Sequence, residues 1–372
     1  MGPRRARSFD GLFTSRSPLP LPSSWLTGPG RLLGHAAFVF VLALVLVCAV
    51  LVGVFGPGSR AGATARPPVD MSYYLDGSTL YTAMHTDGCK QADQDNANSH
   101  SSLVVLDFGR ADTVSGTIEF KEINTSSIIT QTKAATWVNN FSLWYAKCDT
   151  GGHYLTVAVT TNNTSLGSLT AKLAGQALAR VVNAVQSYLH ANSITKAVVV
   201  WGGIDAEVAW SSYPSFTKWF TGYKTTTSNN YLDVGAATGC PPNKSTNENC
   251  SAGSYTWTQD ELYAAAWSNG PAYPAPQIYA TLYEKSSTNW SYTPTRYPSC
   301  NYTVAEMASQ WYSITYSGSA GARLMKPKGP LNTYDLALCT LTPTKSWAAI
   351  TRYFNGTGMP FVLEMKDMLD ST

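Results

Sequence analysis

Short apolar runs alternate with longer amphipathic segments along most of the chain. The clearest run is 197–201, five apolar residues rich in valine, which is typical of a strand buried on both faces of a parallel sheet. Similar runs predict six further strands, at 103–108, 154–160, 231–237, 277–283, 322–325 and 359–365.

Between these runs, the spacing of apolar residues and the start signals of helices predict six helices. The clearest is 166–190, with leucines and valines along one face. Thr258 with Glu261, and Thr303 with Glu306, match the capping box that opens a helix. The complete set of predicted helices is 134–148, 166–190, 213–223, 258–267, 303–316 and 342–354.

Strands that alternate with helices over about 300 residues indicate an α/β fold with parallel strands. The expected architecture is a (β/α)8 TIM-like barrel with one strand irregular or not recognised. A doubly wound open sheet is the alternative, but no G-x-G-x-x-G motif follows the first strand.

An uncharged apolar segment of twenty residues, 36–55, precedes this domain. As a helix it would be about 30 Å long, the thickness of a bilayer core. Arginines precede it, so we expect a cytoplasmic N-terminus and an extracytoplasmic main domain, with single-pass anchoring in the plasma membrane. The expected organisation is a disordered tail (1–33), a transmembrane helix (34–56), a linker (57–69) and the barrel domain (70–372). Cleavage after an A-x-A-like motif at 61–65 is the rival interpretation.

Charge and cysteine content narrow the classes of partner. Residues 1–56 carry five arginines and one aspartate, so the rest of the chain has a net charge of −1 and no basic run for nucleic acid.

Six cysteines follow the apolar segment, and an exported protein would pair them. Cys240 and Cys250 enclose a short loop of turn residues and form the safest predicted disulfide. Histidines and cysteines show no metal-binding spacing, and we expect no metal or other cofactor.

Acidic residues recur at the expected carboxyl ends of the strands, the level at which barrel enzymes hold their catalytic groups. Asp205 and Glu207 follow the run 197–201 and would point the same way in an extended chain. Glycosidic cleavage needs one protonated carboxyl and one ionised group. Glu207 as the acid and Asp205 as its electrostatic partner form the preferred catalytic pair, with Asp107 and Glu284 as further candidates. A structural alternative is that these acids cap the next helix.

Other polar and aromatic residues at the same level are candidates for binding substrate. Asn162 and Asn163 follow the strand 154–160, and aromatic rings there suit the apolar faces of sugars. The predicted binding residues are Asn163, Trp210, Asp233, Tyr279 and Glu364. No G-x-S-x-G elbow, P-loop or H-E-x-x-H motif supports a different chemistry.

Six segments, in this order, resemble a group of exported bacterial proteins of the actinobacterial type: LVVLDFG, TTNNT, VVVWGGIDAEVAW, YLDVGAATGCP, YTWTQDELYAAAW and PAPQIYATLY. The resemblance spans roughly residues 100–365 and implies a glycoside-hydrolase-like barrel. The later D-x-E also resembles barrel muramidases and chitinase-like enzymes, which implies Glu207 as proton donor with Asp205 and Asp107 positioning the substrate. The chain lacks the longer D-x-x-D-x-D-x-E motif of chitinases, because Val200 and Gly203 stand at its first positions.

Two functions therefore remain open at the level of sequence. The first is a membrane-anchored glycoside hydrolase that cleaves peptidoglycan or another polysaccharide. The second is a cell-surface protein that binds glycan, or has a structural role, without catalysis.

Overall fold

The computed structural model describes twelve stretches of the chain: 65–75, 81–122, 127–167, 170–242, 246–270, 272–278, 284–285, 290–291, 304–318, 325–333, 342–354 and 359–367. The predicted membrane segment at 36–55 lies outside these residues. Within them, no helix combines the length and the apolar character needed to cross a bilayer.

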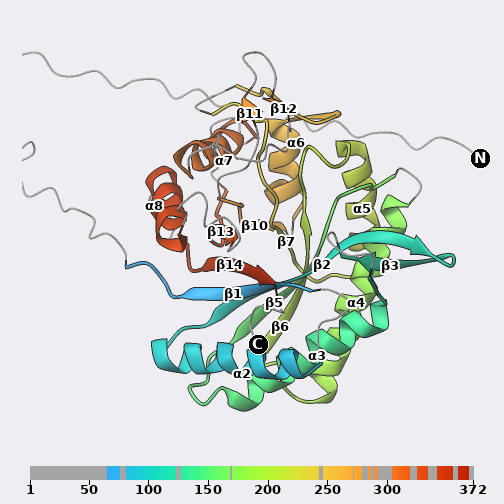
Figure 1. Cartoon of the computed structure of the whole chain (residues 1–372), viewed down its shortest axis with the longest axis vertical. Helices are drawn as coiled ribbons and strands as arrows, with labels where there is room; N and C mark the ends of the chain where they lie inside the picture. Colours follow the sequence, from blue (N-terminus) through green and yellow to red (C-terminus); the bar gives the residue numbers. More distant parts are fainter. Residues whose placement is uncertain are drawn as a thin grey trace, which may run out of the picture. The chain divides into compact units, whose positions relative to one another are not determined.

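A parallel sheet organises the domain (Figure 1). Its strands follow the order β10–β7–β6–β5–β2–β1–β14–β13, and every pairing along this path is parallel. In chain order these strands are β1 (Val69–Tyr74), β2 (Ser102–Val114), β5 (Leu155–Asn162), β6 (Val198–Asp205), β7 (Tyr231–Asp233), β10 (Ala272–Pro274), β13 (Leu331–Thr333) and β14 (Val362–Asp367).

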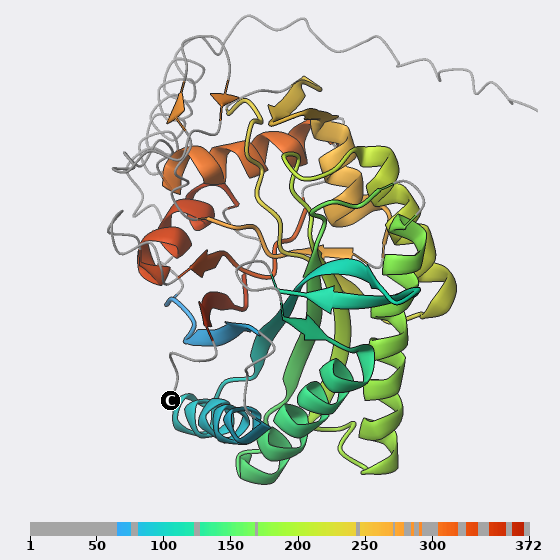
Figure 2. The same ribbon diagram turned by 45° about the vertical axis from the view of Figure 1, so that its right-hand side comes forward.

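Helices connect successive strands and lie outside the sheet, which curls so that its concave face is enclosed (Figure 2). The described α-helices are α2 (Tyr81–Asn98), α3 (Gln131–Cys148), α4 (Ala171–Ala191), α5 (Tyr213–Thr226), α6 (Gln259–Tyr263), α7 (Val304–Gly318) and α8 (Pro343–Tyr353). A short π-helix, η1 (Ala264–Ser268), continues α6.

The two ends of the strand order are linked by the segment that follows β10. Gln277 forms a parallel bridge with Leu331 of β13. The backbone N–H of Ile278 donates to Leu331 O (2.8 Å), and the N–H of Leu331 donates to Pro276 O (2.8 Å). Gln277 N also donates to Gly235 O, just after β7 (3.2 Å). Gln277 therefore contacts strands on both sides of the seam between β10 and β13.

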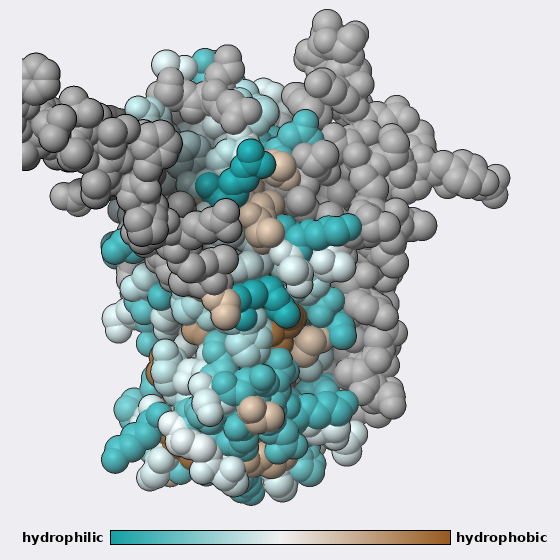
Figure 3. Space-filling view, turned by 90° about the vertical axis from the view of Figure 1, so that its left-hand side faces the viewer, coloured by the Kyte–Doolittle hydropathy of each residue, from teal (hydrophilic) through white to brown (hydrophobic). Residues whose placement is uncertain are grey.

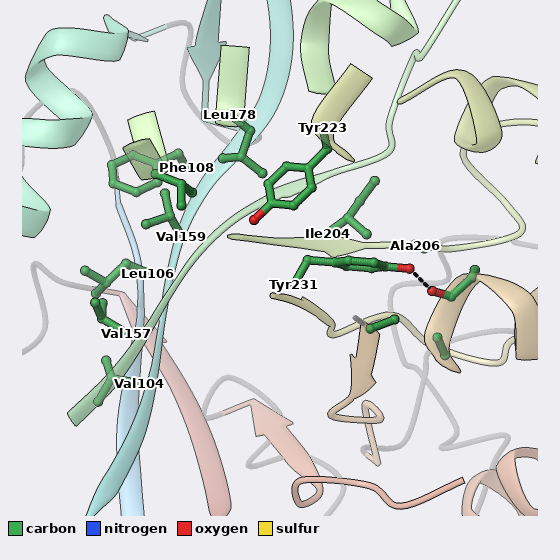
Figure 4. Packing of buried hydrophobic residues seen from close by; sticks show 14 of the residues in the cluster. Val104, Leu106, Phe108, Val157, Val159, Leu178, Ile204, Ala206, Tyr223 and Tyr231 are labelled. Atoms are coloured by element: carbon green, nitrogen blue, oxygen red, sulfur yellow. Dashed lines mark hydrogen bonds between the residues drawn. The ribbon is translucent and has the colours of Figure 1, made fainter. Parts of the chain in front are cut away.

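Alternation along the strands separates two apolar cores. On the convex side, Val104, Leu106, Val157 and Val159 pack with Leu178 of α4 and the other helices (Figure 4). The concave side holds a second cluster, which includes Leu103, Val105, Ala158, Leu232, Leu331 and Leu363. Residues of widely separated strands meet in this second cluster because the sheet curves around it. On the face shown in Figure 3, the coloured surface is mainly polar, with single apolar side chains scattered over it.

One antiparallel extension continues the main sheet, and two antiparallel pairs form separate sheets. β2 continues past the sheet and pairs with β3 (Thr117–Lys121), which pairs with β4 (Ile128–Ile129). Gly109, at a φ of +74°, lies at the register shift where β2 leaves its parallel partner. β8 (Asn249–Ala252) pairs with β9 (Tyr255–Thr258), and β11 (Glu284–Lys285) pairs with β12 (Trp290–Ser291).

The α/β class and the parallel sheet are confirmed, and the valine-rich runs became β2, β5 and β6. Two strand predictions fall mostly outside the described residues. Of the expected strand 277–283, only residues 277 and 278 are described, and Gln277 forms an isolated bridge after β10 (Ala272–Pro274). Of the expected strand 322–325, only Met325 is described; it is not in a strand, and β13 follows at Leu331–Thr333.

The sequence analysis also missed β1 and α2. β1 begins at Val69, which the analysis assigned to a linker, and it alternates apolar residues with the buried Asp70 and Ser72. α2 buries Asp87, Gln91 and Asp95 together with a few small or apolar side chains. Neither element shows the apolar periodicity used to recognise the others, because part of its buried surface is polar.

Within the described residues, two disulfides connect elements of the domain. Cys240–Cys250 is present as predicted and ties the loop after β7 to β8. Cys89–Cys148, which the sequence did not identify, joins α2 to the end of α3.

Candidate functional site

Four carboxyl groups gather at the carboxyl end of the parallel sheet. Asp107 belongs to β2, Asp205 ends β6, Glu207 follows it, and Asp233 ends β7. All four side chains are buried, with between 0% and 7% of their surface exposed. Because burial and mutual repulsion both disfavour charge, each of these groups holds its proton more tightly than an ordinary carboxyl.

Asp107 accepts one hydrogen bond on each of its carboxyl oxygens. It shares a strand face with Leu103 and Val105 of the concave cluster. Its Oδ2 accepts from Thr160 Oγ1 (2.7 Å) and its Oδ1 accepts from Gly109 N (2.8 Å). The absence of a side chain at Gly203 leaves space for Thr160, because a Cβ at 203 would lie 2.5 Å from Thr160 Cγ2. Burial raises the pKa of Asp107 to about 7, although the two donors lower it in part.

Asp205 lies at the centre of the electrostatic interactions. Burial raises its pKa well above the usual value, and Glu207, Asp107 and Asp233 each add to the effect. Gln277 donates a hydrogen bond to the Asp205 side chain and opposes this shift. Within the described residues, Oδ1 of Asp205 has no hydrogen-bond partner. Asp205 therefore presents one oxygen held by the seam segment and one available to a ligand.

Glu207 is placed by the loop that leaves β6. The Asn163 side chain holds this loop: its Oδ1 accepts from Glu207 N (3.1 Å), and its Nδ2 donates to Glu207 O (2.9 Å) and Ser211 Oγ (2.9 Å). Burial, followed by the nearby Asp233, raises the pKa of Glu207 to about 8. At neutral pH Glu207 is therefore mainly protonated, as a general acid must be.

Asp233 is fully buried beside the loop after β6. Its Oδ1 accepts from Gly235 N (3.0 Å) and Ala206 N (3.4 Å). Its Oδ2 has no hydrogen-bond partner among the described residues. Burial raises its pKa to about 7, which the two backbone donors partly offset.

The structure brings together only part of the predicted set of site residues. The four carboxyls described above meet. Trp210 lies partly buried on the same loop as Glu207, and its backbone N–H donates to Glu207 O (3.3 Å). Asn163 was predicted to bind substrate, but its amide is occupied in holding the Glu207 loop. Both its nitrogen and its oxygen are engaged by the protein itself.

Two further predicted residues, Glu364 and Glu284, belong to strands other than those that carry the four carboxyls. Glu364 lies in the middle of β14, opposite Met71 in register, and shares the convex face with Val362. Glu284 begins β11, in a two-stranded sheet separate from the parallel sheet, and nothing further is described of its side chain. Tyr279 lies outside the described residues.

Sequence reasoning missed two residues that shape the site, Thr160 and Gln277. Thr160 ends an apolar strand and gave no signal of its own. Gln277 was taken as the start of a strand, so its contact with Asp205 could not be foreseen. Among the described residues, no group of three or more histidines, cysteines or acids is arranged to hold a metal ion.

No protein-family profile and no curated protein sequence matches this chain. Among solved structures, the chain is similar to the endoglucanase Cel6 of Mycobacterium tuberculosis, determined in complex with a methyl-cellobiosyl-4-deoxy-4-thio-β-D-cellobioside. The sequence identity is 11% and the TM-score is 0.34. The match spans 56% of this chain and 61% of the endoglucanase chain.

Proposed function

We propose that this protein is a glycoside hydrolase whose parallel strands form a (β/α)8 barrel and whose substrate is a polysaccharide. The observation that carries the proposal is the meeting of Asp107, Asp205, Glu207 and Asp233 at one end of the sheet, each with a pKa raised above that of an ordinary carboxyl. The bridge between Gln277 and Leu331 supports the closed barrel.

The environments of the carboxyls divide the roles. Glu207, with a pKa of about 8, keeps its proton at neutral pH and donates it to the leaving glycosidic oxygen. Asp107, with one donor on each of its oxygens, is stabilised as a carboxylate and serves as base, nucleophile or stabiliser. Asp205 interacts electrostatically with Glu207 and Asp107, and it positions the substrate through the carboxyl oxygen that has no hydrogen-bond partner among the described residues.

The location proposed from the sequence is the extracytoplasmic face of the plasma membrane, with segment 36–55 as the anchor. Peptidoglycan and other wall polysaccharides would be the accessible substrates there. This part of the proposal depends on the apolar segment and the arginines before it.

Hydrolysis by the full chain, purified in mild detergent, tests the activity. We expect release of reducing ends from cell wall or from a soluble polysaccharide. The rate should rise as Asp107 loses its proton near pH 7 and fall as Glu207 loses its proton near pH 8. Glu207→Gln should lower the rate by about 10²-fold or more, because general acid catalysis contributes on that order.

Substitution of Asn163 is the control for a displaced loop, because it disturbs the loop that carries Glu207 but leaves the Glu207 carboxyl in the protein. Reducing ends released by Glu207→Gln at the wild-type rate would exclude Glu207 as the proton donor.

Glycan binding without catalysis is the second candidate function. It is favoured by the near-complete burial of the four carboxyls, the most exposed of which, Asp205, shows 7% of its surface. Saturable glycan binding with no product release from any polysaccharide tested would establish this function instead.

A further inference from the structure

Two consecutive asparagines end β5 and have different tasks. The side-chain amide of Asn163 forms hydrogen bonds with the loop that carries Glu207. Asn162 shares a strand face with Ala158 of the concave cluster and with Thr160, the partner of Asp107. Its Oδ1 accepts from Thr164 N (3.0 Å), but within the described residues its Nδ2 has no hydrogen-bond partner.

A buried amide donor without an acceptor is costly, because it has lost its hydration without gaining a hydrogen bond. Asn162 is only 1% exposed, so solvent scarcely reaches it. Such a group in a native protein requires an explanation, and a bound ligand is one.

The neighbouring strand presents a complementary unpaired atom. Asn162 is in register with Asp205 of β6, and the two side chains point to the same face of the sheet. Asp205 Oδ1 has no partner among the described residues. The two strands therefore offer one donor and one acceptor side by side.

A sugar hydroxyl satisfies such a pair, because its oxygen accepts from an amide N–H while its own hydrogen is donated to a carboxylate. The chemical environment also selects the charge of the ligand. The groups that act on the four carboxyls are other carboxyls and hydrogen-bond donors, and none within the described residues is a lysine, arginine or histidine. An anionic sugar would meet repulsion here without a compensating cation.

We infer that Asn162 and Asp205 form a hydroxyl-binding subsite for an uncharged sugar ring, and that the site discriminates against acidic glycans. This inference rests on the proposed function, since it names the class of glycan that the same site takes. Asn162 binds the ligand, whereas Asn163, the residue chosen from sequence, positions the loop.

Binding to the full-length Glu207→Gln protein tests the inference separately from catalysis. The probes are neutral tetrasaccharides of glucose, N-acetylglucosamine, mannose and xylose, compared with tetragalacturonic acid, in calorimetric titrations at pH 8 and pH 5. We expect at least one neutral probe to bind and the acidic probe to bind at least tenfold more weakly at pH 8.

Two substitutions of Asn162, each added to Glu207→Gln, distinguish ligand binding from a structural role. Asn162→Asp keeps the acceptor for Thr164 N and replaces the amide donor by a carboxyl group, whereas Asn162→Ala removes both the donor and the acceptor. We expect each to weaken the neutral probe about tenfold at pH 8, the effect of one lost hydrogen bond. At pH 5 the carboxyl introduced by Asn162→Asp gains a proton, becomes a donor and restores binding in part, while Asn162→Ala remains weak.

Three outcomes would overturn the inference: unchanged affinity in Asn162→Asp at pH 8, equal affinity for the acidic probe, or no binding of any neutral probe. The proposed function fails on a different result, the absence of product release by the wild-type protein. Neutral-glycan binding that depends on Asn162 in a protein that releases nothing would keep the subsite and remove the hydrolase.

Discussion

Asn163 is completely buried, and its amide makes three hydrogen bonds to the loop between β6 and α5. An asparagine is suited to this place because it offers an acceptor and two donors on one short side chain. The position of Glu207 therefore depends on a residue of the neighbouring strand.

Replacing Asn163 by alanine should lower the free energy of unfolding by about 1–3 kcal/mol, because buried polar groups of the loop lose their partners. We expect catalysis to fall at the same time, since Glu207 is no longer held. Chemical unfolding and the rate of hydrolysis check the two effects. Asn163→Asp, which keeps the acceptor for Glu207 N, should retain more of both; equal loss in the two variants would contradict the assigned hydrogen bonds.

At the scale of elements, the hairpin of β2 and β3 begins at a glycine required by geometry. Gly109 has a φ of +74°, and a Cβ there would lie 2.4 Å from Lys121 O on β3. Its N–H also holds Asp107 Oδ1. The turn of the chain at Gly109 thus places both the hairpin and one carboxyl of the site.

The hairpin contains a matched control for substitution of this glycine. Gly116, in the turn between β2 and β3, has a similar φ of +82° but no atom within 4 Å of a Cβ. Gly116→Ala should lower the free energy of unfolding by about 1–2 kcal/mol, because alanine is strained in the left-handed backbone conformation. Gly109→Ala should cost at least about 1–2 kcal/mol more, because the backbone of β3 must move. Thermal unfolding measures both, and equal costs would show that the close approach to Lys121 is not maintained.

Which elements could be predicted depends on how they are buried. β5 and β6 are apolar on both faces, and their runs of valine were sufficient to recognise them. β1 and α2 bury polar groups instead: Asp70 accepts from Leu103 N, and Asp95 accepts from Tyr145 OH across to α3. A polar residue buried by a partner far along the chain looks like a surface residue in sequence.

The candidate site shows the same limit. Asp205 and Glu207 could be paired because they lie two residues apart, and Asp107 and Asp233 because each belongs to a recognisable apolar run. The roles of Asn162 and Asn163 could not be separated, because consecutive residues on a strand point to opposite faces and only the register decides which face is concave. Glu364 was misplaced for a related reason, since β14 continues three residues beyond it, to Asp367.

For the whole molecule, buried carboxyls with raised proton affinity link folding to pH. Burial raises the pKa of Asp70 to about 6, of Asp107 and Asp233 to about 7, and of Glu207 to about 8. In the unfolded chain these groups ionise near pH 4. The folded protein therefore binds more protons between pH 4 and 8, and its stability should fall as the pH rises through that range.

Urea unfolding at intervals from pH 5 to pH 8.5 checks this dependence. The double variant Asp107→Asn with Asp233→Asn removes two of the titrating groups and should show a shallower decline than the wild type. Asp93→Asn, at an exposed position on α2, serves as the control and should leave the slope unchanged. A wild-type stability that rises steadily over this range would contradict the burial of these carboxyls.

Gln277 contacts both the strands at the seam of the sheet and the carboxyl group of Asp205. Its backbone fastens the segment after β10 to β7 and lies in the bridge to β13, while its side chain donates to Asp205. Transient separation of the strands at this seam would withdraw that donor from Asp205 and change the burial of its carboxyl group together. Motion of the strands at the seam is therefore coupled to the proton affinity of Asp205.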